Sequence, residues 1–199
     1  MARQIVRPGG ISMNEFIQLY HEIGPFELVD GEVILKPPQI AGHGEAMHIV
    51  HDAIHEHAAA DGLGKALIEQ AFVVSFTTNW VPGSRIPDVM YYTAERLEAY
   101  KAANPDWKLK PYVLVPDLVI EVISPTDDAN DVSDKIDRYL LDGVRAVWAV
   151  DLARETVSIY TLVAHEPFTR QQTILRVGET LHGGEIIPAF AIPVAQIFA

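Results

Sequence analysis

Apolar residues recur at every third or fourth position in several segments of the chain, which is the spacing of one face of an α-helix. Gly143 follows one of these segments, at a position where a left-handed glycine commonly ends a helix. The pattern therefore predicts helices over residues 13–23, 44–60 and 129–141, and a short helix after residue 93. Asn14 is expected to cap the first helix.

Between these helices the pattern changes to short apolar runs that are typical of strands. Asp30 and Gly31 stand between two such runs, which is a common sequence for a two-residue hairpin turn. Residues 117–123 are almost continuously apolar, and this predicts a strand buried on both faces. Further strands are expected over residues 66–76, 86–92, 145–151, 155–163 and 173–177.

The order of these elements predicts an α/β fold, or an α+β fold with a mixed sheet. An N-terminal helix and hairpin precede the core, and extra strands follow it at the C-terminal side. The chain has 199 residues, and we see no internal repeat and no linker-like segment. We therefore expect a single domain over residues 1–199.

Composition excludes several kinds of chemistry. The chain has no cysteine, which rules out disulfides, thiolate metal sites and a cysteine nucleophile. We see no secretory signal, and no apolar run approaches the roughly 18–20 residues that cross a bilayer, so a cytoplasmic protein is expected. The formal net charge of −12 argues against a dedicated nucleic-acid binder. A nuclease stays compatible with this charge, because metal sites are themselves built from carboxylates.

Two carboxylates interrupt apolar strands. Glu121 is expected in the middle of the strand 117–123, on the same face as Val119, and Asp88 interrupts the strand 86–92. A buried carboxylate is costly unless a cation or several hydrogen-bond donors meet it. If the two strands are neighbours, Asp88 and Glu121 can share a magnesium ion, which needs only one or two protein carboxylates.

Lys135 lies on the helix predicted after this strand, and its ammonium is a candidate for stabilising negative charge or orienting water. The alternative for Lys135 is a solvated lysine paired with Asp131. The alternative for Glu121 is a core glutamate paired with Arg138. The histidine pair at i, i+4 on helix 44–60 lacks the motif of zinc hydrolases, which favours a polar helix face. That pair is His51 and His55.

A set of motifs now resembles the PD-(D/E)XK restriction-endonuclease-like superfamily and, within it, the Uma-type family of bacterial restriction endonucleases. The resemblance covers roughly residues 14–199. It is carried by FELVDGEVILKPP followed by His43, RIPDV at 85–89, PDLVIEVISP at 116–125, Asp131 with Lys135 and Tyr139, GVRAVWAVD at 143–151, and the closing IIPAFAIPVAQIF.

The resemblance implies a restriction-endonuclease-like core and a divalent metal ion, Mg²⁺ or Mn²⁺, in a nuclease whose substrate is nucleic acid, with DNA expected first. Asp88 and Glu121 match its metal-binding and catalytic carboxylates. The second position after Glu121 is Ile123 instead of the motif's lysine, so Lys135 is expected to supply the catalytic lysine. Glu32 and His43 are further candidates, and a homodimer is expected.

Two other functions remain open on the sequence. One is a non-catalytic interaction module with the same fold, and the other is a metal-dependent hydrolase of a different substrate. A Glu121 side chain that lies beside Asp88 and Lys135 would favour the enzyme. A Glu121 side chain locked to Arg138 would favour the module.

Overall fold

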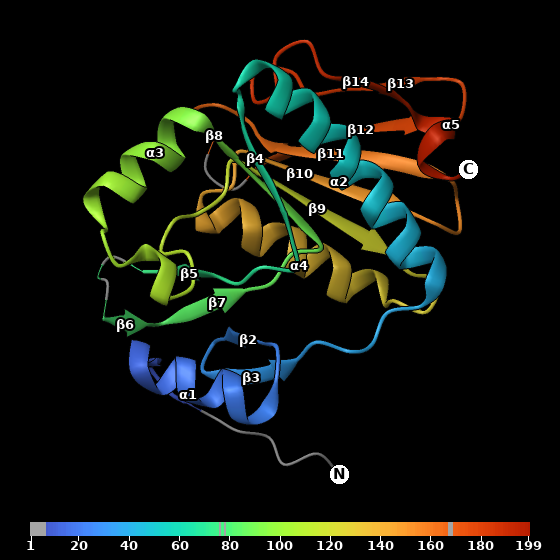
Figure 1. Cartoon of the computed structure of the whole chain (residues 1–199). Helices are drawn as coiled ribbons and strands as arrows, with labels where there is room; N and C mark the ends of the chain where they lie inside the picture. Colours follow the sequence, from blue (N-terminus) through green and yellow to red (C-terminus); the bar gives the residue numbers. More distant parts are fainter. Residues whose placement is uncertain (1–6, 76, 78, 167–168) are drawn as a thin grey trace.

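A mixed six-stranded sheet forms the centre of the computed structural model, which describes residues 7–75, 77, 79–166 and 169–199 (Figure 1). Only the central pair of strands is parallel, and the other neighbours are antiparallel. The strand order is β12 (Arg170–Arg176), β11 (Thr156–Leu162), β10 (Ala146–Asp151), β9 (Leu118–Ile123), β8 (Val89–Thr93) and β4 (Gly64–Ile68). The predicted α/β class with a mixed sheet is confirmed.

Helices cover both faces of this sheet (Figure 1). The long helix α2 (Ala41–Asp61) and the short α5 (Val194–Ile197) pack on one face, together with β13 (Thr180–His182) and β14 (Ala191–Pro193). On the other face lie α4 (Ala129–Asp142), α3 (Ala94–Ala103) and the 3-10 turn η1 (Trp107–Leu109). Because β9 is covered on both sides, it is nearly all apolar, as its sequence predicts.

A smaller four-stranded sheet lies beside the central one, near the N-terminal helix. Its hairpin turns at Asp30 and Gly31, whose φ angles of 50° and 85° are both left-handed, as a two-residue hairpin turn requires. The predicted hairpin is therefore confirmed. The strand order is β3 (Glu32–Leu35), β2 (Phe26–Val29), β7 (Gly83–Arg85) and β5 (Phe72–Val74).

Helix α1 (Met13–Ile23) has the predicted bounds, but its cap differs from the prediction. Ser12, at the end of β1 (Ile11–Ser12), accepts a hydrogen bond from the backbone N–H of Glu15. Asn14 lies inside the helix, because the extended backbone needed for a cap occurs at Ser12. Strand β1 pairs with β6 (Trp80–Val81) and anchors the helix start.

Two predicted strands are shorter or divided in the structure. Residue 76 of the predicted strand 66–76 lies outside the described residues. The rest of this segment contributes to β4 and β5, because Glu69 adopts a left-handed φ of 47° and ends the first strand. The segment 86–92 begins pairing only at Val89, after Pro87, which has no N–H for a ladder. In the part of the chain that the structure describes, no helix is long and apolar enough to span a membrane.

Candidate active site

Asp88 directly precedes β8, and Glu121 lies in the neighbouring strand β9 of the central sheet. The antiparallel register pairs Val89 with Ile120, so the next positions along the two strands are Asp88 and Glu121. Asp88 and Glu121 therefore lie next to one another at the end of the β8–β9 pairing. The backbone N–H of Val122 also donates to Asp88 Oδ2 at 2.8 Å, which fixes this carboxylate against β9. The fold therefore brings the two predicted carboxylates together.

Glu121 is held by two side chains from α4. Lys135 Nζ lies 2.9 Å from Glu121 Oε2, and the Tyr139 hydroxyl donates to Oε1 at 2.5 Å. Lys135 and Tyr139 stand at i and i+4, so one helix face presents both donors. Glu121 does not pair with Arg138, and Lys135 does not pair with Asp131, within the described residues. The structure thus matches neither structural alternative for these two side chains.

Burial raises the pKa of Glu121 to about 7, in spite of the favourable charge of Lys135. The negative charges of Asp88 and Glu27 and the desolvation of the carboxylate all favour the protonated form. The same carboxylates raise the pKa of Lys135 and outweigh the effect of its burial, so this lysine stays charged. Glu121 can therefore change its protonation state near neutral pH while Lys135 does not.

Asp88 is almost fully buried, with 2% of its surface exposed, yet it is the more acidic carboxylate of the pair. Burial alone would raise its pKa, but His43 and Lys36 lie close enough to hold the pKa well below its usual value. Lys36 Nζ lies 3.0 Å from Asp88 Oδ1, and the pKa of Lys36 is correspondingly raised against the effect of its burial. Asp88 is therefore ionised across the physiological range.

His43 is the predicted candidate from α2, and it reaches the site from the helix's first turn. Its Nε2 lies 3.1 Å from Asp88 Oδ2 but is not aligned for a hydrogen bond, and the nitrogen has no other partner in the described part of the chain. Its Nδ1 lies 3.4 Å from the hydroxyl of Ser124. His43 thus bridges Asp88 and the loop that follows β9.

Glu32, the other predicted candidate, lies away from this group. It is exposed at the first position of β3, beside the hairpin turn. Lys36 is four residues further along the same segment, about 13 Å away for an extended chain. The acidic side chain that the hairpin does supply is Glu27 of β2, which lies 3.8 Å from Lys135 and accepts from the N–H of Ile86 at 2.8 Å.

Sequence reasoning missed Glu27 and Lys36. Both belong to the segment FELVDGEVILKPP, and both interrupt its apolar pattern as Glu121 interrupts β9. Glu27 stands between two buried residues of β2, and Lys36 directly follows β3. The signal was therefore present, but only the docking of the hairpin shows which of its charged residues face the central sheet.

Asp117, which directly precedes β9, has a structural environment. It is fully buried and lies 2.8 Å from Arg96 and 3.5 Å from Arg145. It also accepts from the backbone N–H and the hydroxyl of Thr93 at the start of α3. These contacts join α3 to the beginnings of β9 and β10, at the opposite end of β9 from Glu121.

The side chains in this group are of the chemical types that bind a hard divalent cation. Glu27, Asp88 and Glu121 offer carboxylate oxygens, which magnesium prefers, and the buried Nε2 of His43 has no hydrogen-bond partner among the described residues. In the described ranges, no group of three or more His, Asp or Glu side chains could hold a metal ion as the side chains lie here. Lys36 and Lys135 instead neutralise the carboxylates in this state.

Solvent reaches this region beside Lys36. A hollow of about 550 Å³ is lined by Pro25, Lys36, Gln39, Glu69 and Ile86, together with the two prolines that follow Lys36. Lys36 therefore contacts both the hollow and Asp88, and it also contacts Glu69 at 3.2 Å on the outer side. A polar molecule in the hollow lies one side chain away from the buried carboxylates.

Comparisons with known proteins bear on the fold and the family of this chain. A crystal structure described as "a putative nuclease belonging to DUF820 from Anabaena variabilis" superposes with a TM-score of 0.73 at 18% sequence identity, covering 94% of this chain and 97% of that one. At this identity the likeness shows a shared fold. A search of curated proteins gives no match. The model of the family Uma2, described as "Putative restriction endonuclease", matches residues 13–195, and the chain belongs to this family.

Proposed function

We propose that this protein is a metal-dependent endonuclease that hydrolyses phosphodiester bonds, with Asp88 and Glu121 as the metal-binding carboxylates. The observation that carries the proposal is the pairing of Glu121 with Lys135 beside Asp88. A carboxylate pair with an adjacent lysine suits hydrolysis of a phosphodiester, because metal and ammonium both oppose negative charge that develops on the phosphate. Membership of a restriction-endonuclease family supports the same reaction class.

The chain's own residues have distinct roles in this proposal. Asp88 is the permanently ionised ligand, because Lys36 and His43 keep its pKa low. Glu121 is oriented by the Tyr139 hydroxyl, and Lys135 holds a positive charge beside Glu121 that would oppose negative charge on a phosphate bound there. A bound Mg²⁺ or Mn²⁺ ion would supply a more acidic water and a counter-charge for the phosphate oxygens. Glu27 adds negative charge that tunes both Glu121 and Lys135.

The experiment is cleavage of supercoiled plasmid and of single-stranded DNA and RNA with Mg²⁺ or Mn²⁺, comparing wild type with Asp88→Ala and Glu121→Ala. Glu32→Ala is the matched control, because it removes an exposed carboxylate that lies away from the site. The proposal expects cleavage by wild type and Glu32→Ala, and its loss in the other two variants with unchanged circular dichroism. No cleavage by wild type, with no metal binding in calorimetry, would favour the non-catalytic module.

Metal binding without nucleic-acid cleavage would favour the hydrolase of another substrate. We further propose a homodimer, which sedimentation equilibrium would test directly. A monomer at all concentrations would remove the dimer and leave the nuclease proposal intact, since every side chain in the site comes from one chain.

A further inference from the structure

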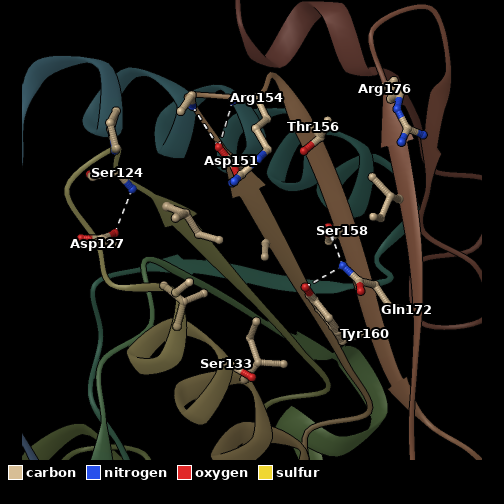
Figure 2. A pocket seen from close by; sticks show the side chains of 18 of the residues that line it. Ser124, Asp127, Ser133, Asp151, Arg154, Thr156, Ser158, Tyr160, Gln172 and Arg176 are labelled. Atoms are coloured by element: carbon tan, nitrogen blue, oxygen red, sulfur yellow. Dashed lines mark hydrogen bonds and ion pairs between the residues drawn. The ribbon is translucent and has the colours of Figure 1, made fainter.

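A second hollow, of about 870 Å³, lies on the same face of the central sheet (Figure 2). It is enclosed by the first half of α4 and by strands β10, β11 and β12. The sheet register places Glu121 opposite Ala149 and Ala149 opposite Ser158, so one row of residues runs from the carboxylate site into this hollow. Neighbouring strands are about 4.8 Å apart, which puts Ser158 roughly 10 Å from Glu121 along the row.

The hollow has an apolar floor and a polar wall. Ile123, Val132, Ile136 and Ala149 supply the floor from β9, α4 and β10. On the wall, the side-chain amide of Gln172 donates to the hydroxyls of Ser158 at 3.2 Å and Tyr160 at 2.8 Å. The amide carbonyl of Gln172 makes no hydrogen bond to the described residues. An apolar surface beside hydroxyl and amide groups suits a flat ring with polar edges, which is the chemistry of a nucleobase.

Arginines surround the hollow although the whole chain is strongly acidic. Arg154, Arg170 and Arg176 line it, against the aspartates Asp127 and Asp151. Arg154 is paired with Asp151 at 2.7 Å, and Arg170 is paired with a carboxylate of α4 at the same distance.

Arg176 differs from the other two arginines. Its side chain is exposed and has no ion pair or hydrogen bond among the described residues, and Figure 2 shows it at the rim. Its guanidinium is therefore available for a phosphate, which it can bind through two parallel hydrogen bonds.

Ser124 connects this hollow with the carboxylate site. It lines the hollow at the end of β9, and its hydroxyl lies 3.4 Å from Nδ1 of His43, which contacts Asp88. The two regions thus flank α4, with Lys135 and Tyr139 on one side and Ser133 and Ile136 on the other.

We propose that this hollow binds one nucleotide of the nucleic acid that the carboxylate site cuts, with its base outside the duplex stack and its phosphate on Arg176. The proposal rests on the nuclease function proposed above. The volume lies within the roughly 300–1,000 Å³ of ligand pockets and is large enough for a nucleotide. A paired base cannot enter without leaving the stack, so single-stranded substrate binds more tightly than the matched duplex.

The test is fluorescence anisotropy of a labelled single-stranded DNA oligonucleotide in EDTA, where no cleavage occurs. Ser158→Trp fills the hollow and is expected to weaken binding about tenfold or more, the value of a stacked base. Arg176→Ala is expected to weaken binding and to reduce the slope of log affinity against log salt by about 0.7 in magnitude, the loss of one phosphate contact. Lys65→Ala is the control, because it removes an exposed positive charge from β4, the opposite edge strand.

Wild-type affinity in Ser158→Trp, equal weakening in Arg176→Ala and Lys65→Ala, or no binding by wild type would each overturn the proposal. Arg176 is exposed, so its variant keeps the test decisive even if Ser158→Trp fails to fold. Plasmid cleavage with Mg²⁺, measured separately, distinguishes the two proposals. DNA binding that depends on Ser158 and Arg176, without any plasmid cleavage, supports nucleotide binding in the hollow and contradicts the nuclease proposal. Plasmid cleavage, together with DNA binding that neither substitution changes, supports the nuclease proposal and contradicts nucleotide binding in the hollow.

Discussion

Lys135 Nζ lies 2.9 Å from Glu121 Oε2, although 14 residues separate them and they belong to different elements. Glu121 comes from the middle of a buried strand and Lys135 from the helix that packs back over it. In the motif that the sequence resembles, the lysine stands two residues after the acidic residue, where this chain has Ile123. The helix therefore places an ammonium where the strand itself has an apolar side chain.

Lys135→Ala should remove the positive charge that stabilises the phosphate and should lower kcat by about 10²–10³-fold, the usual cost of losing one such group. It should also move the acid limb of the pH–rate profile to higher pH, because Lys135 lowers the pKa of Glu121. The measurement is plasmid cleavage against pH, with Lys65→Ala as the charge-matched control. Unchanged kcat in Lys135→Ala would show that this lysine has only a structural role.

Wild-type activity should rise with pH through about 7, because Glu121 must lose its proton to act as a ligand. A metal ion competes with that proton, so a higher Mg²⁺ concentration should move the limb to lower pH. The measurement is a set of pH–rate profiles at several metal concentrations. A limb near pH 4, independent of metal, would mean that Glu121 is not the group that titrates.

Glu27→Gln should move the same limb to lower pH, opposite to the effect of Lys135→Ala. The negative charge of Glu27 raises the pKa of Glu121, and glutamine keeps an oxygen for the N–H of Ile86. Glu32→Gln, in the same hairpin, should leave the profile unchanged because Glu32 is exposed beside the turn. A shift of the acid limb in Glu32→Gln, with none in Glu27→Gln, would contradict this prediction. It would show that Glu32, and not Glu27, is the hairpin residue that acts on Glu121.

Glu121→Gln should gain stability relative to wild type as the pH rises. The folded-state pKa of about 7 lies above the unfolded value near 4.5, so the folded state favours the protonated carboxyl. This contribution to stability is complete below pH 4.5 and is lost as pH rises through 7. The free energy of unfolding of wild type relative to Glu121→Gln should therefore fall by up to about 3 kcal/mol between pH 4 and pH 8. Urea denaturation of both proteins at pH 4 and pH 8 measures this change. A difference in unfolding free energy that is the same at both pH values would contradict the prediction.

Asp117→Asn should destabilise the fold without a specific change in the pH–rate profile. Asp117 is fully buried between Arg96 and Arg145, and breaking a buried pair by removing one partner costs about 3–5 kcal/mol. The measurement is urea denaturation together with cleavage under conditions where the variant remains folded. A folded variant with a shifted acid limb would place Asp117 in the catalytic machinery.

The sequence by itself determined much of the fold. The alternation of apolar and polar residues is a local property, so it marked the hairpin at Asp30 and Gly31, the bounds of α1 and the buried strand β9 without knowledge of their neighbours. It also marked Asp88 and Glu121, because a carboxylate inside an apolar strand is costly and stands out. Helix caps and strand ends are not marked by this alternation, since Ser12 and Glu69 act through backbone angles that several residue types permit.

Only the tertiary structure decided which charged residues meet. Glu27 and Glu32 look alike along the chain, yet the docking of the hairpin partly buries Glu27 beside Lys135 and leaves Glu32 in solvent. Lys36 likewise reaches Asp88 across 52 residues of sequence. Electrostatic interactions depend on distance and burial in space, and neither quantity is encoded in local periodicity. The sequence therefore identified the two strand carboxylates, and the packing of α2, α4 and the hairpin around them decided their partners and their pKa values.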